Sequence, residues 1–433
     1  MIGFLRPLAE WCLGAMRAWT PSGALSISIY FIVQIAGVLL SFITIIIVAR
    51  WGGAAAQGVF FTYKTLVDFI TTILLFGLPQ AYIFLINKER ATVSGITLFT
   101  YIYSVASILV ALAAILFYLD SYRISDPGVL AIATLSVGVG GYVLHGLARG
   151  IILTRAVAGL FSVFSVVPAV LLLIGIVFQF SDGSPNFPLA IGVTGFLSGM
   201  ISAVWLSRMS KPRLRDLPSL PYRALVTQSL HTFIQSSLYA AQPVLTVAML
   251  RGRSGTDVDI GNFSIAVTAF SAINVVVSVM GPVLFNRWTK SISWVQYSTL
   301  ARRTYWFSGV LMLLAGIVVL AAGPVVDVVL GPAYQDAVLP IQLMAFAVFP
   351  LLSTRFLSSA VYALGHPGVN SLSCLARLGM VAAFFFVSYS LTDNILASGA
   401  MSWVAGEWIA FAVQAGGASR ARRAALAQQP AAI

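Results

Sequence analysis

The chain has very few charged residues for its length. Of its 433 residues, only 9% are Asp, Glu, Lys or Arg, whereas about 25% is usual for a soluble domain. Hydrophobic residues make up 59%, and the mean hydropathy is +0.95. So few polar groups could not cover a water-exposed surface. The composition therefore excludes a soluble protein and predicts one whose solvent is the lipid bilayer.

Cysteine, histidine and catalytic motifs are also sparse. Cys12 and Cys374 are far apart in apolar stretches, and His145, His231 and His366 are solitary. This pattern excludes a disulfide framework and a metal cluster. No Gly-rich phosphate loop ends in Lys-Ser/Thr, and no serine has the flanks of a nucleophile elbow. We therefore predict that the chain is not an enzyme and has no catalytic residue, metal or cofactor.

Acidic residues are fewer than basic ones, 13 against 25, which gives a net charge of +12. This excess does not indicate a nucleic-acid partner, because Lys and Arg lie in short loops between apolar runs, as topology determinants do. With the N-terminus inside, eighteen basic residues fall in cytoplasmic loops, and the outer loops hold four: Arg50, Arg123, Arg251 and Arg253. Both termini are therefore predicted to be cytoplasmic.

The apolar runs predict an all-α integral membrane protein. Each run has about 20 to 29 residues, enough to cross about 30 Å of hydrocarbon at about 1.5 Å per residue. The twelve expected transmembrane helices are 24–49, 58–86, 95–118, 128–148, 156–180, 188–207, 224–249, 260–285, 304–326, 338–360, 371–391 and 396–415.

The distribution of charge and proline predicts five parts. Residues 1–20 form an amphipathic helix in the interface, with a signal peptide as the alternative. The N-lobe (21–207) and the C-lobe (224–418) hold six spans each. A basic linker with three prolines, 208–223, separates them on the cytoplasmic side. Residues 419–433 are an Ala/Gln-rich basic tail, expected to be disordered.

An internal repeat supports two similar lobes. The stretch from Ala49 to Asn87 contains a Gly-rich turn between two apolar helices, and a second copy follows 203 residues later. The matched pairs are Arg50 and Arg253, Gly52 and Gly255, Gly58 and Gly261, Phe60 and Phe263, and Pro79 and Pro282. A repeat of about half the chain in a membrane protein predicts two pseudo-symmetric six-helix lobes with a site between them.

Charges within spans mark the candidate site, because a charge in hydrocarbon is costly unless it is paired or lines a wet cavity. Lys64 and Asp68 share one helix face at i, i+4 spacing, which favours an ion pair, a cavity-facing pair, or both. Glu407, near the middle of the last span, needs a partner, and Arg377 on the neighbouring span is the candidate. Arg149 and Arg355 lie nearer helix ends, where an arginine also snorkels to the interface.

Several motifs resemble those of bacterial polysaccharide flippases of the Wzx type, in the multidrug/oligosaccharidyl-lipid/polysaccharide (MOP) exporter superfamily. They are the R-x-G loop, Gly58 at the start of the second span, Gly77-Leu78-Pro79 at its end, and Leu330-Gly331-Pro332-Ala333-Tyr334 before the tenth. The resemblance implies a MATE-like fold with a central cavity that opens alternately to each side. It implies that the chain lies in the bacterial inner membrane and moves an undecaprenyl-pyrophosphate-linked oligosaccharide to the outer leaflet.

This cargo suggests roles for the candidate residues. A pyrophosphate attracts arginine and lysine in a low-dielectric cavity, so a cationic lining is expected from Lys64, Arg149, Arg355 and Arg377. Gln34 and Tyr63 are candidates for sugar contacts. Because no nucleotide site is present, protonation of Asp68 or Glu407, or Na⁺ binding, is the expected coupling step. Membrane lipids and a polysaccharide polymerase or co-polymerase are the expected partners.

Three other functions compete with this one. A multidrug and toxin extrusion (MATE) antiporter shares the architecture but needs an acidic cavity, and here only Asp68 and Glu407 are acidic within spans. A lipid II flippase of the same superfamily usually has fourteen spans. A membrane-embedded glycosyltransferase or ligase needs a large outer loop with catalytic acids, and the outer loops here are short.

Overall fold

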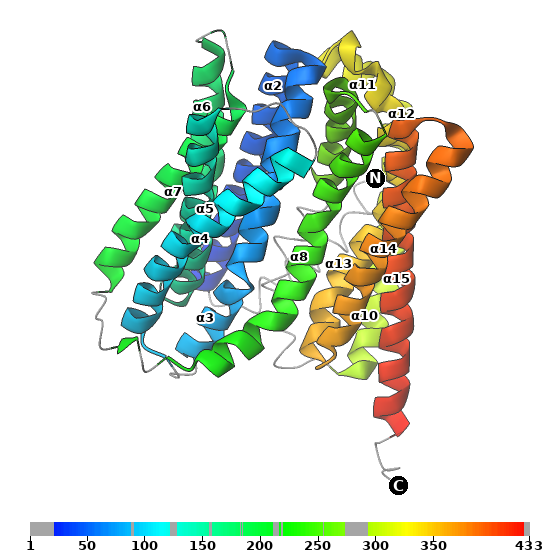
Figure 1. Cartoon of the computed structure of the whole chain (residues 1–433). Helices are drawn as coiled ribbons and strands as arrows, with labels where there is room; N and C mark the ends of the chain where they lie inside the picture. The colour runs from blue at the N-terminus through cyan, green and yellow to red at the C-terminus, as the bar shows by residue number, and fades with distance from the viewer. Residues whose placement is uncertain are drawn as a thin grey trace.

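In the computed structural model, the described part of the chain forms helices joined by short turns and contains no strand (Figure 1). The described residues are 21–87, 91–121, 128–155, 158–181, 183, 185–210, 216–217, 220–253, 255–272 and 293–427. The predicted interfacial helix 1–20 lies outside these residues, as do Pro282 of the repeat and parts of the linker at 211–215 and 218–219.

The spans follow the predicted order. The N-lobe contains α2 (Pro21–Leu75), α3 (Leu78–Asn87), α4 (Val93–Ser121), α5 (Val129–Arg155), α6 (Ala158–Ser181) and α7 (Phe187–Met209). The C-lobe contains α8 (Tyr222–Gly252), a helix over 257–272, α10 (Trp294–Leu320), α11 (Ala322–Val329), η2 (Pro332–Ala337), α12 (Val338–Met344), η3 (Ala345–Ala347), α13 (Val348–Ala363), α14 (Pro367–Thr392) and α15 (Ile395–Ala427).

The number of spans agrees with the sequence prediction. Within the described residues, nine helices are long and apolar enough to cross a membrane, or ten when the bent pair α10–α11 is one span. The first, Ile32–Ile86, has 55 residues, more than twice what about 30 Å of hydrocarbon requires, and it contains two spans. The helix over 257–272 covers the start of the predicted span 260–285, and the rest of that span lies outside the described residues. The described helices thus agree with a multi-pass membrane protein of about twelve spans.

The turn between the first two spans is much shorter than predicted. Residues 50–57 were expected to form a Gly-rich loop, but the chain is helical on both sides of Gly53. Gly53 alone breaks the helix, with φ 75° and ψ −178°. Glycine populates such positive φ values without a Cβ penalty, so one residue is enough to separate the two helices of α2.

The predicted end of the second span at Gly77-Leu78-Pro79 is a break within it. Phe76 and Gly77 have positive φ values of 47° and 67°, and α3 resumes the helix at Leu78. The C-terminal tail also differs from the prediction, because α15 continues to Ala427. The stretch from Arg420 to Ala427 is rich in alanine and arginine, two strong helix formers, and contains no glycine or proline.

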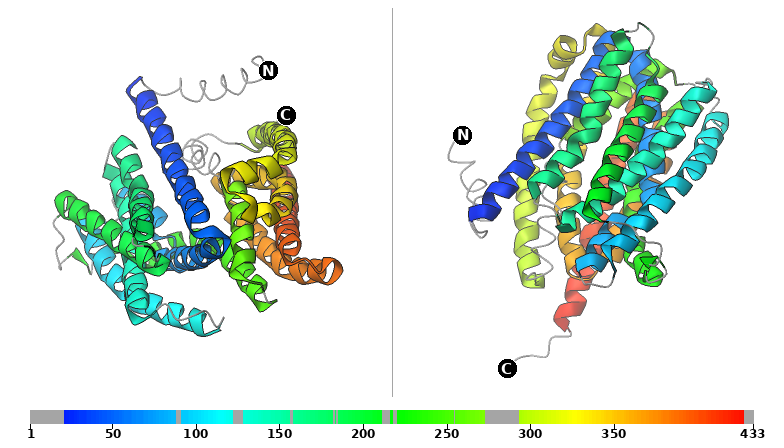
Figure 2. Two further views of the ribbon diagram at one scale, coloured as in Figure 1. Left: turned by 90° about the horizontal axis from the view of Figure 1, so that it is seen from above. Right: turned by 90° about the vertical axis from the view of Figure 1, so that its left-hand side faces the viewer.

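Each lobe supplies most of one apolar core. In the N-lobe core, Phe60 is 3% exposed and packs edge-on against Phe187 of α7, with ring centroids 5.7 Å apart. In the C-lobe core, its repeat equivalent Phe263 is fully buried and packs edge-on against Trp403 of α15, at 6.1 Å. The two lobes therefore bury equivalent residues in equivalent ways, as the repeat predicts. Viewed from above, they form two groups of helices that meet along α2 and α8 (Figure 2).

Small residues bring helices close together inside the N-lobe. A Cβ on Gly138 of α5 would lie 2.5 Å from the Gly192 carbonyl oxygen of α7, and a Cβ on Gly141 would lie 2.1 Å from that of Gly195. These glycines are therefore packing sites between α5 and α7. Such close backbone approach drives helix association in lipid, where burial of apolar surface gives no advantage.

The closest approach between the lobes joins two residues of the repeat. A Cβ on Gly58 would lie 1.8 Å from the Asp257 carbonyl oxygen, and a Cβ on Gly261 would lie 1.9 Å from that of Ala54. Since 54 and 257 are also separated by 203 residues, the two contacts are equivalent under the internal repeat. The second span and the helix over 257–272 thus cross backbone to backbone on a pseudo-two-fold axis.

An apolar cluster lies beside this crossing and also joins the lobes. It combines Ala49 and Ala54 of the N-lobe with Ile265, Val326, Tyr334 and Ala337 of the C-lobe, all buried. The Tyr334 hydroxyl donates to the Ala49 carbonyl at 3.4 Å. Arg50 donates from Nε to the Val329 carbonyl at 2.6 Å, at the C-terminal end of α11. This end of the molecule, predicted to be the outer one, is closed.

We expect Gly261→Val to open this end, because no side chain fits between the crossing helices. The readout is cross-linking by a short bifunctional thiol reagent of Ala49→Cys with Ala337→Cys, in a chain whose own Cys12 and Cys374 are replaced by serine. Cross-linking should fall severalfold. Gly316→Val is the matched control, because a Cβ there meets open space. Equal cross-linking in both variants would contradict the crossing.

Candidate functional site

The most deeply buried charges lie in the C-lobe. Arg377 of α14 and Glu407 of α15 are 2% and 1% exposed, and Arg377 Nε lies 3.1 Å from Glu407 Oε1. The pair is not aligned as a hydrogen bond, so it is held by opposite charge. The predicted partnership of these two residues is confirmed. Both charges are needed in such a setting, because either one alone would be buried without compensation.

A tyrosine on α8 joins a second arginine to this pair. The Arg355 guanidinium carbon lies 3.7 Å from the centroid of the Tyr239 ring, and that of Arg377 lies 5.5 Å from the same centroid. Helices α13, α14 and α8 supply these three side chains. The electron-rich face of an aromatic ring attracts a guanidinium, so Tyr239 holds two cations close together without neutralising them.

Several hydrogen-bond donors around this cluster are unsatisfied among the described residues. They include Nε and Nη2 of Arg355, Nη1 of Arg377, and the side-chain nitrogens of Gln235 and Gln242. Gln235, Tyr239 and Gln242 follow i, i+4, i+7 spacing and therefore share one face of α8. We name Gln235, Tyr239, Gln242, Arg355 and Arg377 the arginine–tyrosine cluster. Its donors and positive charge suit a ligand that has only acceptor oxygens, such as a phosphate.

The second charged pair lies in the N-lobe. Lys64 Nζ and Asp68 Oδ2 form the predicted i, i+4 ion pair, and their side chains are 32% and 57% exposed. Over 54–75 only Ala55 and Asp68 are exposed. An ionised side chain on the open face of a membrane helix is stable where it meets water, and costly where it meets lipid. The Lys64–Asp68 face is thus the hydrophilic side of the second span.

The other predicted site residues lie apart from these pairs. Arg149 is near the inner end of α5, one turn from His145, whose Nδ1 lies 3.1 Å from Ser202 Oγ. Gln34 is half-buried on α2, and its side-chain nitrogen has no partner among the described residues. Tyr63 is 3% exposed in the N-lobe core, so its ring has no open surface for a sugar. The structure brings Arg355 and Arg377 together, while Lys64 and Arg149 belong to the other lobe.

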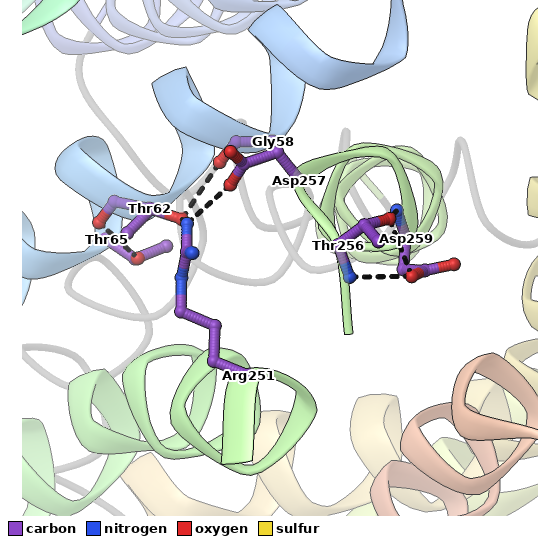
Figure 3. A network of polar contacts seen from close by, with 7 residues as sticks. All are labelled: Gly58, Thr62, Thr65, Arg251, Thr256, Asp257 and Asp259. Carbon is purple, nitrogen blue, oxygen red and sulfur yellow. Dashed lines mark hydrogen bonds and ion pairs between the residues drawn. The ribbon is translucent and has the colours of Figure 1, made fainter. Parts of the chain in front are cut away.

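A polar network supports the closed end, and the sequence did not predict it (Figure 3). Arg251 of α8 pairs with Asp257 at 2.5 Å, and its Nη2 also lies 3.5 Å from Thr62 Oγ1 in the N-lobe. Thr256 and Asp259 form a reciprocal cap at the start of the helix over 257–272, with Thr256 N donating to Asp259 at 2.7 Å and Asp259 N donating to Thr256 Oγ1 at 3.2 Å. Arg251 therefore links the lobes beside the Gly58–Gly261 crossing.

Comparison with known proteins identifies the fold. No protein-family model matches the chain, and no curated protein matches its sequence. Among solved structures, an inward-facing MATE-family multidrug resistance transporter of the MOP superfamily superimposes with a TM-score of 0.71 at 12% identity, over 93% of this chain and 100% of that one. An outward-facing form gives 0.70 at 16% identity, over 96% and 98%. The chain has the MATE-like fold.

The structure of a flippase is also similar to that of this chain. The lipid II flippase MurJ, in an inward closed conformation, superimposes with a TM-score of 0.69 at 10% identity, over 90% of this chain and 87% of that one. The predicted MATE-like architecture is therefore confirmed over almost the whole chain. At these identities the comparison establishes the fold, and the choice of cargo depends on the residues of this chain.

The buried pair predicts a specific pattern of stability. Arg377→Met should lower the thermal stability strongly, since removing one partner of a buried ion pair costs about 3–5 kcal/mol. Adding Glu407→Gln should restore most of that loss. The readout is the melting temperature of the purified protein in detergent. Lys64→Met is the control, because an exposed pair contributes only about 0–1 kcal/mol. A double variant no more stable than Arg377→Met would contradict this account.

Proposed function

We propose that this protein is a flippase that moves an undecaprenyl-pyrophosphate-linked oligosaccharide across the bacterial inner membrane for surface polysaccharide synthesis. The observation that carries the proposal is the arginine–tyrosine cluster, in which Arg355 and Arg377 share the Tyr239 ring at 3.7 Å and 5.5 Å. A pyrophosphate presents several anionic oxygens, and a guanidinium binds such groups with directed, charge-assisted hydrogen bonds.

The balance of charge within the spans favours an anionic cargo. Of the six charged residues predicted for the site, four are cationic and two are acidic. Each acid is already paired, Asp68 with Lys64 and Glu407 with Arg377. Arg355 is in no ion pair among the described residues, and two of its nitrogens have no hydrogen-bond partner. A cationic drug would find no unpaired acid at this cluster, whereas a pyrophosphate would find an available guanidinium.

A lipid II-type cargo is the second candidate. The similarity to MurJ supports a lipid-linked substrate, and a pyrophosphate joins the lipid to the sugar in both kinds of cargo. The arginine–tyrosine cluster would therefore recognise the part that the two have in common. The twelve spans of this chain favour the oligosaccharide flippase, because the resemblance assigns fourteen to the lipid II type.

The transport cycle that we propose uses the closed end as a gate. In this form the Gly58–Gly261 crossing and Arg251 close the predicted outer side, so cargo would enter from the cytoplasmic leaflet, with both termini on that side. The pyrophosphate would move to the arginine–tyrosine cluster while the lipid tail stays in the bilayer. Opening of the outer crossing would release the cargo to a polymerase or co-polymerase in the outer leaflet.

Arg355→Gln should abolish most of the flipping without unfolding the protein, because Arg355 has no ion-pair partner among the described residues. The assay is transfer of a short prenyl-pyrophosphate-linked glycan between leaflets of proteoliposomes. We expect a loss of about 10- to 100-fold, equivalent to one charge-assisted contact of about 1.5–3 kcal/mol. Arg303→Gln, an exposed residue of α10, is the matched control. Normal flipping by Arg355→Gln, or equal losses in both variants, would refute this role.

Asp68 is the residue that we propose for coupling to a proton or sodium gradient, because it is the exposed acid within a described span. A bound cation would release Lys64 from its ion pair and change the charge that the cargo meets. Asp68→Asn should therefore flip cargo at a rate that no longer depends on an imposed pH or Na⁺ gradient. Asp336→Asn, an exposed outer acid, should keep the dependence. If Asp68→Asn alone still followed the gradient, this proposal would fail.

A further inference from the structure

A crevice separates α10 and α15 at the predicted cytoplasmic end of the C-lobe. Both helices pack against α13, which lies behind the crevice. Its volume is approximately 300 Å³, several times the share of about 30 Å³ that one water occupies in the liquid. The polar side chains that line it are Tyr297, Ser298, Arg302 and Tyr305 from α10, and Ser419 and Arg422 from α15.

The crevice combines an apolar floor with a cationic rim. Ala301 and Ala418 are 8% and 1% exposed and belong to the apolar cluster beneath it. Arg302 and Arg422 are exposed on opposite walls. Among the described residues, the ion pairs lie elsewhere and neither of these two arginines is paired with an acidic side chain. Two arginines with tyrosine and serine hydroxyls form a donor set suited to a phosphate group.

The surroundings place the crevice at the height of lipid headgroups. Helix α10 begins at Trp294, whose ring packs edge-on against that of Tyr297 with centroids 5.4 Å apart. Tryptophan and tyrosine gather where hydrocarbon meets the headgroup layer. Further along α10, Trp306, Leu313 and Ile317 are 61%, 71% and 64% exposed. A polar, cationic crevice thus continues into an apolar helix surface in the direction of the membrane.

We propose that this crevice binds an anionic phospholipid, with its phosphate between Arg302 and Arg422 and its acyl chains along α10. Basic pockets between transmembrane helices on the cytoplasmic side bind such headgroups. The lipid would bridge α10 and α15 at this end, beyond the point where the Tyr305 ring of α10 packs edge-on against the Phe411 ring of α15, with centroids 5.4 Å apart. This site lies apart from the arginine–tyrosine cluster. The lipid proposal therefore does not depend on which cargo the protein moves.

The test measures bound lipid and thermal stability of the purified full chain, with phosphatidylglycerol as the probe. Phosphatidylglycerol should remain bound in native mass spectrometry and raise the melting temperature, whereas phosphatidylcholine should do neither. Arg302→Gln with Arg422→Gln should weaken binding about 30-fold, since each arginine near an anionic surface contributes about a factor of five. The matched control is Arg303→Gln with Arg423→Gln, which removes the same charge from exposed positions one residue away.

A second variant tests the crevice without changing its charge. Ala415→Leu would place a larger side chain in the crevice and should also reduce phosphatidylglycerol binding while both arginines remain. If the two double variants lost phosphatidylglycerol binding equally, the specific site would be refuted and the binding would be a general attraction to a basic surface. An equal effect of inorganic phosphate alone would overturn the lipid and leave a free anion as the ligand. No phosphatidylglycerol effect in the unmodified chain would overturn the proposal altogether.

Discussion

The cost of placing a charge in hydrocarbon is the constraint on which the rest of this structure depends. Lys64 pairs with Asp68 on the hydrophilic face of the second span, and Arg377 pairs with Glu407 in the C-lobe. Arg355 lies against the Tyr239 ring instead of an acid. A charge retained at such a cost is expected to have a function. The proposed anionic cargo would therefore bind at the arginine–tyrosine cluster.

The internal repeat produces two equivalent backbone contacts at the lobe interface. Gly58 and Gly261 occupy equivalent positions, and each lies directly against the backbone of the helix in the other lobe. Gly58 faces the carbonyl oxygen of Asp257, and Gly261 faces that of Ala54. Only glycine permits this approach on both sides. This contact is backbone against backbone and is supported by Arg251, and opening it would also separate the apolar cluster that joins the lobes beside it.

The sequence predicted the fold well, because apolar length, loop charge and the repeat are visible without packing information. It also predicted the Arg377–Glu407 pair, since two costly charges on neighbouring spans need each other. It missed Tyr239, although the spacing of Gln235, Tyr239 and Gln242 indicates one polar face of α8. Tyr63 was placed in the cavity, but it packs in the core. Which face of an apolar helix turns inward depends on its neighbours, and hydropathy alone does not show it.

Recognition of a lipid pyrophosphate by the arginine–tyrosine cluster can be measured directly as binding. Undecaprenyl pyrophosphate, undecaprenyl phosphate and a lipophilic cation would be titrated against the protein in lipid nanodiscs, with and without Arg355→Gln. The pyrophosphate should bind more tightly than the monophosphate, and Arg355→Gln should remove this preference. Tight binding of the cation, with no preference for pyrophosphate, would contradict this recognition and favour a multidrug exporter.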